Sequence, residues 1–328
     1  MMDLKSRLAI GVDLGGTKID IGLVDETGIV RHHERMETPV SLGPGAIEKL
    51  ILDTIRRVQD KAEVPLLGIG IGVAGQVDQQ TGNVLFAPNL RWNNVPLRAN
   101  LEKALDLPVR IINDARALTM GEWQYGAGKG FQDIVCLFIG TGIGGGVVSK
   151  GILMCGCSNT FGEVGHLTID FNGPLCTCGK RGCLEAFCGG WGIAACARDA
   201  IEKDSRGAAS LNLLQLVGDK PEDLRASHVV QAYRQGDPMA LQLIEGMGTA
   251  LIAGCASIVN ILNPCRLIVG GGFVEGMPEI IEILSLGVKR DALKAATKSL
   301  EVVRAKLGKE LGVLGSAAII FDLLKGSD

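Results

Sequence analysis

The stretch VDLGGTKIDIGLV at residues 12–24 reads as a strand, a glycine turn and a second strand. The same pattern returns at residues 137–148 as LFIGTGIGGGVV. In a turn without side chains, successive backbone N–H groups form a concavity that binds anions, and threonine hydroxyls add donors. The alternative for either turn alone is that its glycines only allow a tight hairpin. Because the pattern occurs in both halves of the chain, we predict that the two turns bind the phosphates of one polyphosphate.

Two further glycine patterns match the dinucleotide-binding fingerprint G-x-G-x-x-G without its structural context. They are Gly70, Gly72 and Gly75, and Gly140, Gly142 and Gly145. The fingerprint binds a pyrophosphate where a helix begins at the glycines, but turn and strand patterns follow both of these. The P-loop pattern G-x-x-x-x-G-K-[ST] is also missing, because Thr precedes Lys in GGTK at residues 15–18. The sequence therefore disfavours a Rossmann fold and a P-loop.

Strand and helix patterns alternate along the rest of the chain, which predicts a mixed α/β protein. Strand patterns cover residues 7–16, 17–25, 29–37, 66–73, 109–114, 133–140, 147–153 and 266–272. Helical patterns cover residues 46–61, 97–106, 115–125, 189–203, 211–217, 238–262 and 311–324. No linker rich in Pro, Ser or Gly separates the halves. We predict two lobes that face a cleft, residues 1–115 and 116–310, with the C-terminal helix at 311–328 completing the first.

Composition disfavours several classes of protein. The 328 residues are 47% hydrophobic and carry a formal charge of −3 without a run of Lys or Arg, so we predict no nucleic-acid partner. No long apolar run and no signal-like segment stand out, so we predict no membrane partner and a cytoplasmic protein. In a chain of this size, the 10 cysteines indicate reduced thiols and a metal site rather than disulfides.

Acidic residues stand at the ends of two buried-looking strands. Asp13 ends the first strand beside the glycine turn, where a carboxylate can hold Mg²⁺ through water while the metal bridges phosphate oxygens. Asn113 and Asp114 end the strand at the junction of the predicted lobes. A carboxylate there can accept the proton of a substrate hydroxyl as its oxygen attacks phosphorus. The alternatives are a turn cap for Asp13 and a helix N-cap for the Asn-Asp pair.

The stretch GHLTIDFNGPLCTCGKRGCLE at residues 165–185 contains a group of soft metal ligands. They are His166, Cys176, Cys178 and Cys183. Three thiolates and one imidazole fill the tetrahedral shell of Zn²⁺ and leave no position for a catalytic water, so we predict a structural metal. A competing set uses Cys155 and Cys157 with Cys176 and Cys178 and leaves His166 unbound. The negative charge of the chain disfavours a zinc-knuckle nucleic-acid module.

In combination, these residues resemble the ROK family (repressor, open reading frame, kinase), a branch of the actin-like and hexokinase-like sugar kinases. The matching motifs are DLGGTK at 13–18, GVAGQVD at 72–78, PNLRW at 88–92, NDARALTMGE at 113–122, IGTGIGGG at 139–146, GEVGH at 162–166, CTCGKRGCLE at 176–185 and IVGGG at 268–272. They span most of the chain. The signature GH…CxCGxxGCxE, in order with the Asn-Asp pair and the glycine loops, is highly specific.

The resemblance implies an α/β fold of two actin-like lobes, in which a nucleotide and a sugar meet in the cleft. Asp114 is then the general base for a sugar hydroxyl. The implied sugar contacts are Gly75, Asn113, Asp114, Glu163, His166 and Glu185. The implied contacts to ATP are Asp13, Gly15, Gly16, Thr17, Lys18, Thr141 and Gly142 at the phosphates, and Gly271 and Gly272 near the adenosine. The resemblance also favours His166, Cys176, Cys178 and Cys183 over the competing metal set.

Two departures from the family pattern concern the sugar. Residue 116 is Arg where many relatives carry a small or amide residue, and Asn159, Thr160 and Phe161 replace a run of small residues. Arg116 is then either a surface residue of its helix or a contact at the rim of the sugar. The phosphate and base positions match the family, so the departures leave open the sugar and not the reaction.

The resemblance predicts a glucokinase-like enzyme that transfers the γ-phosphate of ATP to the 6-hydroxyl of a hexose, with D-glucose as the first expectation. Mg²⁺ is the expected cofactor, Zn²⁺ the expected structural metal and a homodimer the expected assembly. An N-acetylmannosamine kinase is the nearest alternative, and inorganic polyphosphate would fit the same anion sites as ATP. Sugar-responsive repressors of this family carry a DNA-binding module ahead of the same lobes. We disfavour that class because the first phosphate turn begins at residue 13.

Overall fold

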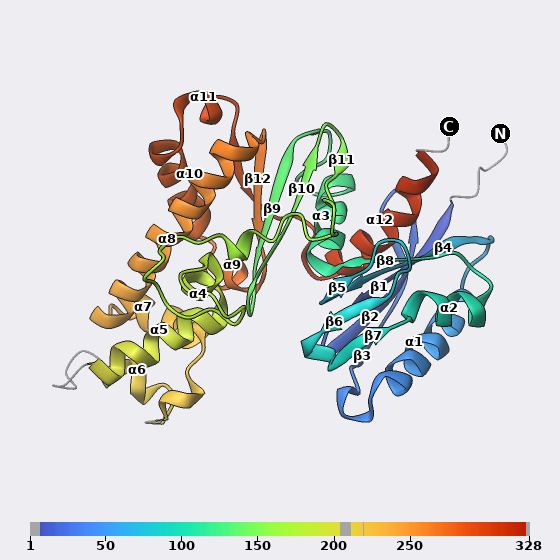
Figure 1. Ribbon diagram of the computed structural model, residues 1–328, viewed down its shortest axis with the longest axis horizontal. Helices are drawn as coiled ribbons and strands as arrows, with labels where there is room; N and C mark the ends of the chain where they lie inside the picture. Colours follow the sequence, from blue (N-terminus) through green and yellow to red (C-terminus); the bar gives the residue numbers. More distant parts are fainter. Residues whose placement is uncertain (1–6, 204–210, 219, 326–328) are drawn as a thin grey trace. The chain divides into compact units, whose positions relative to one another are not determined.

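The computed structural model describes residues 7–203, 211–218 and 220–325 (Figure 1). Contacts divide the chain into two compact units. The first unit comprises Met1–Phe131, Gly151–Phe161 and Lys306–Asp328, and the second comprises Gln132–Lys150 and Gly162–Ala305. Each unit contains a mixed sheet packed with helices, which confirms the predicted α/β class.

The sheet of the first unit is an antiparallel meander extended by parallel strands. Its strands are β1 (Leu8–Leu14), β2 (Lys18–Asp25), β3 (Val30–Glu37), β4 (Leu66–Val73) and β8 (Val109–Asn113), in the order β3-β2-β1-β4-β8. β2 is antiparallel to both β1 and β3, whereas β4 is parallel to both β1 and β8. The strands β1, β4 and β8 therefore end at the same edge of the sheet.

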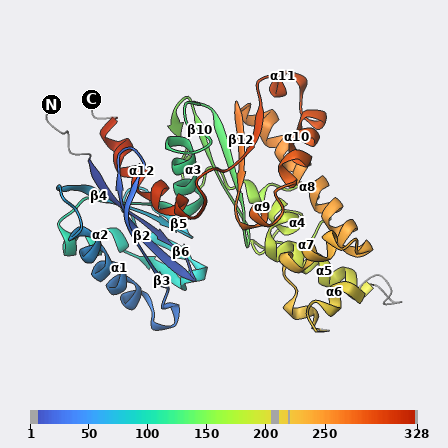
Figure 2. The same cartoon turned by 180° about the vertical axis from the view of Figure 1, so that it is seen from behind.

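Helices cover both faces of this sheet (Figures 1 and 2). An apolar core joins the sheet to α1 (Pro44–Gln59) and α2 (Leu97–Leu105), and a second core joins it to α12 (Leu311–Lys325). Glycines let α12 approach the strands closely, because a Cβ at Gly11 would lie 2.0 Å from the carbonyl oxygen of Val313. The C-terminal helix thus packs on the first unit.

A small sheet and short helices complete the first unit. The small sheet consists of β5 (Gln76–Val77), β6 (Val84–Ala87) and β7 (Trp92–Val95). The other elements of the unit are the two-residue strand β11 (Ile152–Leu153), the short helices η1 (Val40–Leu42), η2 (Pro88–Leu90) and η5 (Gly308–Glu310), and the longer helix α3 (Asp114–Gln124). β6 pairs antiparallel with β5 and with β7. Buried residues of this small sheet, among them Trp92, join the core beneath α1.

The second unit repeats the combination of a hairpin with parallel strands. Its strands are β9 (Ile134–Ile139), β10 (Ile143–Ser149), β12 (Arg266–Gly270) and β13 (Glu301–Arg304), in the order β10-β9-β12-β13. β9 and β10 are antiparallel, whereas β12 is parallel to β9 and β13. The helical elements are η3 (Val164–His166), α4 (Leu184–Cys188), α5 (Gly190–Lys203), α6 (Leu211–Gln215), η4 (Pro221–Asp223), α7 (Ala226–Arg234), α8 (Pro238–Leu262), α9 (Gly272–Gly276), α10 (Ile280–Asp291) and α11 (Lys294–Thr297).

The long helix α8 forms the centre of the helical part of the second unit. Its N-cap, Asp237, accepts a hydrogen bond from the N–H of Ala240 at 2.8 Å, and Pro238 follows as the first helical residue. By length and composition α8 could cross a membrane, which the sequence prediction did not anticipate. However, 61% of its most apolar window is buried, and it packs against α4, α7 and α10. These contacts are those of a core helix.

The structure contains elements that were not predicted, among them β5, β6, β7, β13 and α7, and it differs in detail at two further places. The predicted loop at residues 141–146 is shorter, because Gly144, Gly145 and Gly146 lie in β10 and pair with β9. A side chain does not fit at Gly145, because a Cβ there would lie 2.5 Å from Cγ2 of Val164. The short helix α4 was not predicted, because five residues are too few to show a helical period.

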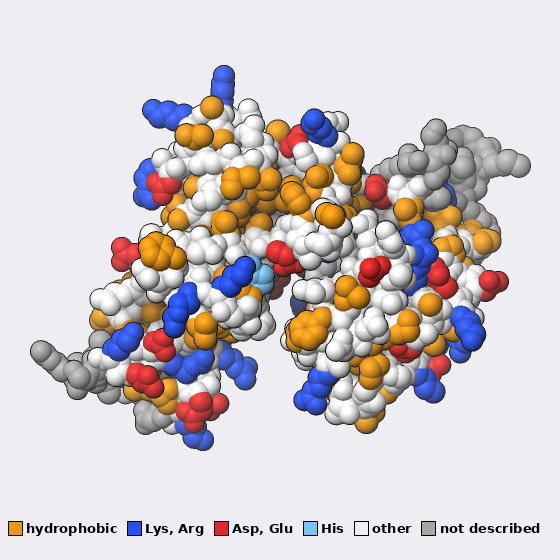
Figure 3. Space-filling model, viewed as in Figure 1, with side chains coloured by type: hydrophobic (Ala, Val, Ile, Leu, Met, Phe, Trp, Pro, Cys, Tyr) orange, Lys and Arg blue, Asp and Glu red, His pale blue; other side chains and the backbone are white. Residues whose placement is uncertain are grey.

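The two units also differ from the predicted lobes. The prediction placed residues 116–310 in one lobe, whereas the contacts assign α3 to the first unit because it packs against α12 and β4. On the face shown in Figure 3, positive and negative side chains are interspersed among apolar ones.

Candidate active site

The ends of the parallel strands in the first unit bring the predicted acidic residues to one edge of the sheet. Asp13 on β1 pairs with Gly72 on β4, and the next residue of β4, Val73, pairs with Asn113 on β8. Asp114 follows as the first residue of α3. Ligands of α/β sheets commonly bind beyond the carboxyl ends of the strands. The first unit therefore brings together the predicted Mg²⁺ ligand and the predicted base.

Asn113 and Asp114 hold each other in place at the start of α3. The side-chain oxygen of Asn113 accepts from the N–H of Arg116 at 3.3 Å. Asn113 is therefore the N-cap of α3, the alternative role that was predicted for the Asn-Asp pair. Its Nδ2 donates to Oδ1 of Asp114 at 2.9 Å and to the carbonyl oxygen of Gly75 at 3.3 Å. Oδ1 of Asp114 also accepts from the N–H of Ala115 at 2.8 Å. These bonds fix the orientation of the Asp114 carboxylate.

Asp13 lies close to two other carboxylates. Burial, together with the negative charges of Asp114 and Asp20, raises the pKa of Asp13 to about 6. The helix α12 lies against this side chain, since a Cβ at Gly312 would be 2.3 Å from Oδ2 of Asp13. A divalent cation near Asp13 would offset the repulsion between the carboxylates, so the residues fit the predicted Mg²⁺.

The first glycine turn connects β1 to β2. The N–H of Gly15 donates to the carbonyl oxygen of Lys18 at 3.1 Å, and the hydroxyl of Thr38 donates to the carbonyl oxygen of Gly15 at 2.7 Å. Gly16 has no room for a side chain, because a Cβ would lie 2.7 Å from the carbonyl oxygen of Asn89. The tight turn alone accounts for these glycines, so their contact with phosphate stays a prediction.

The other predicted residues of the first unit flank this turn. Thr17 and Lys18 are exposed where β2 begins, and Nζ of Lys18 lies 3.7 Å from Oδ2 of Asp20. Gly75 follows β4, and a Cβ there would lie 2.6 Å from the carbonyl oxygen of Phe86. Only glycine therefore allows the backbone to pass here and to present its carbonyl oxygen to Asn113.

Arg116 is buried, which contradicts its interpretation as a surface residue of α3. Its guanidinium donates to both the side-chain oxygen and the carbonyl oxygen of Asn159. Asn159 has a left-handed backbone with φ of 57° and donates from Nδ2 to the carbonyl oxygen of Val77 at 2.7 Å. The two departures from the family pattern thus form one internal contact, which ties residues 151–161 to α3 and β5. Separated by 43 positions, the pair gave no sequence signal.

In the second unit, the turn between β9 and β10 carries Thr141 and Gly142. The N–H of Gly140 donates to the carbonyl oxygen of Gly142 at 2.9 Å, which closes the turn. The turn is also bonded to the first residues of α5, because the N–H groups of Gly190 and Trp191 donate to the carbonyl oxygens of Gly140 and Thr141 at 2.9 and 3.0 Å. The predicted phosphate turn is therefore held by backbone bonds from two directions.

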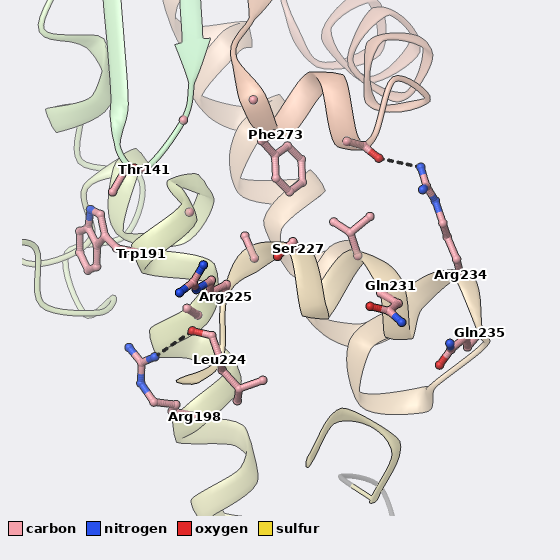
Figure 4. A pocket seen from close by; sticks show the side chains of 17 residues that line it. Thr141, Trp191, Arg198, Leu224, Arg225, Ser227, Gln231, Arg234, Gln235 and Phe273 are labelled. Carbon is pink, nitrogen blue, oxygen red and sulfur yellow. Dashed lines mark hydrogen bonds between the residues drawn. The ribbon is translucent and has the colours of Figure 1, made fainter. Parts of the chain in front are cut away.

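The second unit contains a cavity of about 990 Å³ that begins at this turn (Figure 4). Thr141, Trp191 and Phe273 lie along it, and α7 presents Ser227, Val230, Gln231 and Arg234 at helical spacing. The sequence prediction missed this face of α7, whose i, i+3, i+4 pattern was the available signal. Of the predicted nucleotide residues, Thr141 and Gly272 line the cavity. Gly271 does not line the cavity, and the backbone itself requires glycine at this position. Its φ is 96°, and a Cβ would lie 2.4 Å from the carbonyl oxygen of Ile139.

The predicted metal ligands converge in the second unit. His166, Cys176, Cys178 and Cys183 place one donor atom each within 4.8 Å of the others. Sγ of Cys176 lies 3.8 Å from Nδ1 of His166, and Sγ of Cys178 lies 3.6 Å from Sγ of Cys183. Zn–S bonds of about 2.3 Å in a tetrahedron place the sulfurs roughly 3.8 Å apart, so the cluster fits Zn²⁺. Cys155 and Cys157 lie in the first unit and outside this cluster.

The predicted sugar contacts of the second unit lie near the metal ligands in sequence. Glu163 and His166 are exposed, as the N-cap and the last residue of η3, which packs on β10. Glu185 is buried on α4, and its Oε2 accepts from the N–H of Ile143 at 2.7 Å. Glu185 thus has a bonded role inside the unit, and its contact with a sugar stays a prediction.

Sequence comparison matches nearly the whole molecule, since the profile of the ROK family covers residues 9–322. The chain belongs to the ROK family. This ROK protein is 37% identical to a glucokinase of Thermotoga maritima over 318 residues, which are 97% of this chain and 98% of the relative. The family membership predicted from the motifs is therefore confirmed.

Solved structures of the ROK family share the fold. A glucokinase of Streptomyces griseus, crystallised with glucose and AMPPNP, is 32% identical with a TM-score of 0.76, over 95% of this chain and 98% of that one. A ROK hexokinase of Thermus thermophilus is 30% identical with a TM-score of 0.82, over 97% and 99%. This ROK protein thus has the two-lobed, hexokinase-like fold that the sequence predicted.

Proposed function

We propose that this ROK protein is an ATP-dependent hexose kinase that phosphorylates the 6-hydroxyl of D-glucose. The observation that carries this proposal is the pair of carboxylates at the strand ends. Asp114 is close enough to raise the pKa of Asp13, and its own orientation is fixed by donors from Asn113 and Ala115. Asp114 is suited to act as the base, and Asp13 is suited to bind the metal ion that contacts the phosphates. Phosphoryl transfer to a hydroxyl requires both groups. The full-length similarity to glucokinases supports the same reaction.

In the proposed reaction, Asp114 accepts the proton of the 6-hydroxyl while the sugar oxygen attacks the γ-phosphorus and ADP leaves. We propose that Gly75, Asn113, Glu163, His166 and Glu185 bind the other sugar hydroxyls. Carboxylates suit this task because they accept directional, charge-assisted hydrogen bonds from hydroxyl groups. Most of the rate enhancement would come from holding the reacting groups in line.

We propose that the two glycine turns bind the phosphates of ATP. The residues are Gly15, Gly16, Thr17 and Lys18 in the first turn, Thr141 and Gly142 in the second, and Gly271 and Gly272 near the adenosine. Asp13 would hold Mg²⁺, which supplies positive charge to the transferring phosphate. The aromatic side chains of Trp191 and Phe273 in the cavity favour a nucleoside over inorganic polyphosphate, which has no apolar group to bury.

We further propose that Zn²⁺ at the Cys/His cluster is structural and that the protein is a cytoplasmic homodimer. The cluster supplies four protein donors, so a tetrahedral ion there has no open position for a substrate. The core packing of α8 is consistent with a protein outside the membrane.

A coupled assay of ADP release tests the proposed activity and its sugar. The panel is glucose, mannose, N-acetylmannosamine, N-acetylglucosamine, fructose and allose, each with ATP and with polyphosphate as donor. We expect Mg²⁺-dependent turnover with ATP, fastest with glucose. Preference for N-acetylmannosamine would establish the alternative kinase. Binding of a sugar without turnover for any member of the panel would contradict a kinase and favour a sugar-responsive binding protein.

The raised pKa of Asp13 predicts how nucleotide binding depends on pH. Because burial and neighbouring carboxylates raise this pKa to about 6, Asp13 holds a proton below that pH and carries a charge above it. Only the ionised form attracts Mg²⁺, so the KM for MgATP should rise by about tenfold per pH unit as the pH falls below 6. KM measured between about pH 5 and about pH 8 tests this dependence. Asp13→Asn should have a high KM that varies little with pH, and an unchanged profile in that variant would contradict the assignment.

A further inference from the structure

We infer that Glu185 is a positioning residue that links the Cys/His cluster to the nucleotide-binding turn. This inference rests on the proposed function, because it assigns the turn at Thr141 to the nucleotide. It gives the predicted structural metal a specific task. The metal would hold the turn that receives phosphate, with Glu185 as the connection.

One oxygen of Glu185 holds the turn directly. Oε2 accepts from the N–H of Ile143 at 2.7 Å, immediately after Thr141 and Gly142. The carboxylate lies so close to the turn that a Cβ at Gly142 would be 2.3 Å from Oε2. The absence of a side chain at Gly142 is thus explained by the approach of Glu185 as well as by any phosphate.

The other oxygen of Glu185 contacts Trp191 and the cysteine loop. Oε1 accepts from Nε1 of Trp191 at 3.3 Å, and Trp191 lines the cavity beside Thr141 (Figure 4). The hydroxyl of Thr177 lies 3.5 Å from the same oxygen. Thr177 stands between Cys176 and Cys178, two members of the cluster. The carboxylate is therefore shared by the turn, the cavity wall and the cysteine loop.

The backbone provides a second connection between the same parts. Cys183, the last member of the cluster, is the N-cap of α4, and Glu185 lies in the first turn of that helix. The N–H of Gly189 donates to the carbonyl oxygen of Glu185 at 2.8 Å, which leads directly to the bonds from Gly190 and Trp191 to the phosphate turn. An ion bound by Cys183 would therefore fix the start of a short, continuous path of bonds to Thr141.

This arrangement has an energetic consequence for nucleotide binding. Glu185 is 9% exposed, so its oxygens have the surrounding donors in place of water as hydrogen-bond partners. A turn held by these donors presents its N–H groups to phosphate without further ordering, and preorganisation of this kind increases affinity. When the carboxylate or the cysteine loop is released, the turn must be ordered during binding. Affinity for nucleotide should then fall even when no sugar is present.

The test measures the dissociation constant of AMPPNP with Mg²⁺ and without sugar by titration calorimetry. Glu185→Gln keeps the size of the side chain, but its amide can accept at only one of the two oxygen positions. We expect the dissociation constant to rise about tenfold, the effect of losing one hydrogen bond to a charged group. Removing the metal from the unaltered protein with a chelator should produce a rise of similar size, with metal content measured by mass spectrometry and folding by circular dichroism.

A combination of the two changes separates this link from independent effects. Because the backbone connection remains in Glu185→Gln, removing the metal from that variant should still raise the dissociation constant, but by clearly less than it does in the unaltered protein. Two full effects that multiply would overturn the inference, as would an unchanged affinity after either change. Thr177→Val keeps every cysteine and serves as a milder variant should Glu185→Gln lose its metal or its fold. We expect a rise of about threefold, and no rise would count against the link.

Glu282→Gln is the matched control, because Glu282 is an exposed carboxylate in the first turn of α10, in the same unit and not among the residues that line the cavity. It should leave the affinity for AMPPNP within about twofold of the unaltered protein. If neither the unaltered protein nor any variant binds AMPPNP, the proposed function itself is overturned. If AMPPNP binds and its dissociation constant changes neither in Glu185→Gln nor after removal of the metal, only the link through Glu185 is overturned.

Discussion

Asp114→Asn is expected to lower kcat for glucose by about a thousandfold, because the variant cannot accept the proton of the attacking hydroxyl. The fold should be retained. The amide oxygen of Asn can replace Oδ1 of Asp114 as acceptor for the N–H of Ala115, and Asn113 still caps α3. Initial rates at saturating MgATP measure this effect, and equilibrium binding of glucose shows whether the sugar site is intact.

The control for this variant is Asp106→Asn, the same chemical change at an exposed position of the same unit. Asp106 has φ of 52°, a conformation that Asn adopts readily, so the variant should fold and turn over normally. Metal content should be unchanged in both variants, because neither residue belongs to the Cys/His cluster. An Asp114→Asn protein with near-normal kcat would refute the assigned base.

Cys183→Ser is expected to abolish binding of Zn²⁺ and to lower the thermal midpoint by roughly 10 °C. A hydroxyl is a poor ligand for zinc, and the cluster would keep only three donors. Cys183 is fully buried and is the N-cap of α4, so loss of the metal would release this helix from the cysteine loop. The estimate assumes about 3 kcal/mol of lost stabilisation in a unit of this size. Metal analysis of the purified variant and a thermal melt provide the two measurements.

Cys155→Ser is the matched control for the metal site. Cys155 lies outside the converging cluster, so this variant should keep its zinc and its thermal midpoint. Loss of metal from Cys155→Ser, with retention in Cys183→Ser, would instead support the competing set of Cys155, Cys157, Cys176 and Cys178. Zinc absent from the unaltered protein, even after it is supplied, would contradict a metal at this position altogether.

Local sequence patterns were sufficient to predict much of the fold. The hairpin of β1 and β2 follows from alternating apolar residues around one glycine turn, and α8 follows from a capping Asp, a Pro and a sustained helical period. The Cys/His cluster could be predicted because its ligands lie within eighteen consecutive positions. In each case the residues that determine the structure are neighbours in the chain, so their spacing carries the information.

Contacts between distant residues could not be predicted in this way. Arg116 meets Asn159 across 43 positions, and nothing in either local pattern indicates a buried pair. The contact of Glu185 with a sugar stays a prediction, and its bond to the N–H of Ile143 could not be predicted because it depends on how α4 packs against β10. The cavity likewise gathers Thr141, Trp191, Phe273 and one face of α7, which are separated in sequence by whole elements. Tertiary packing determines these positions.

The identity of the products shows whether this protein transfers phosphate from ATP to the 6-hydroxyl of glucose. The purified protein is incubated with MgATP and glucose, and the phosphorus species are followed by ³¹P nuclear magnetic resonance. We expect equal amounts of ADP and glucose 6-phosphate, with neither formed when the sugar is omitted. Release of ADP with free inorganic phosphate, or ATP that stays intact with glucose and with every other hexose of the panel, would contradict this transfer.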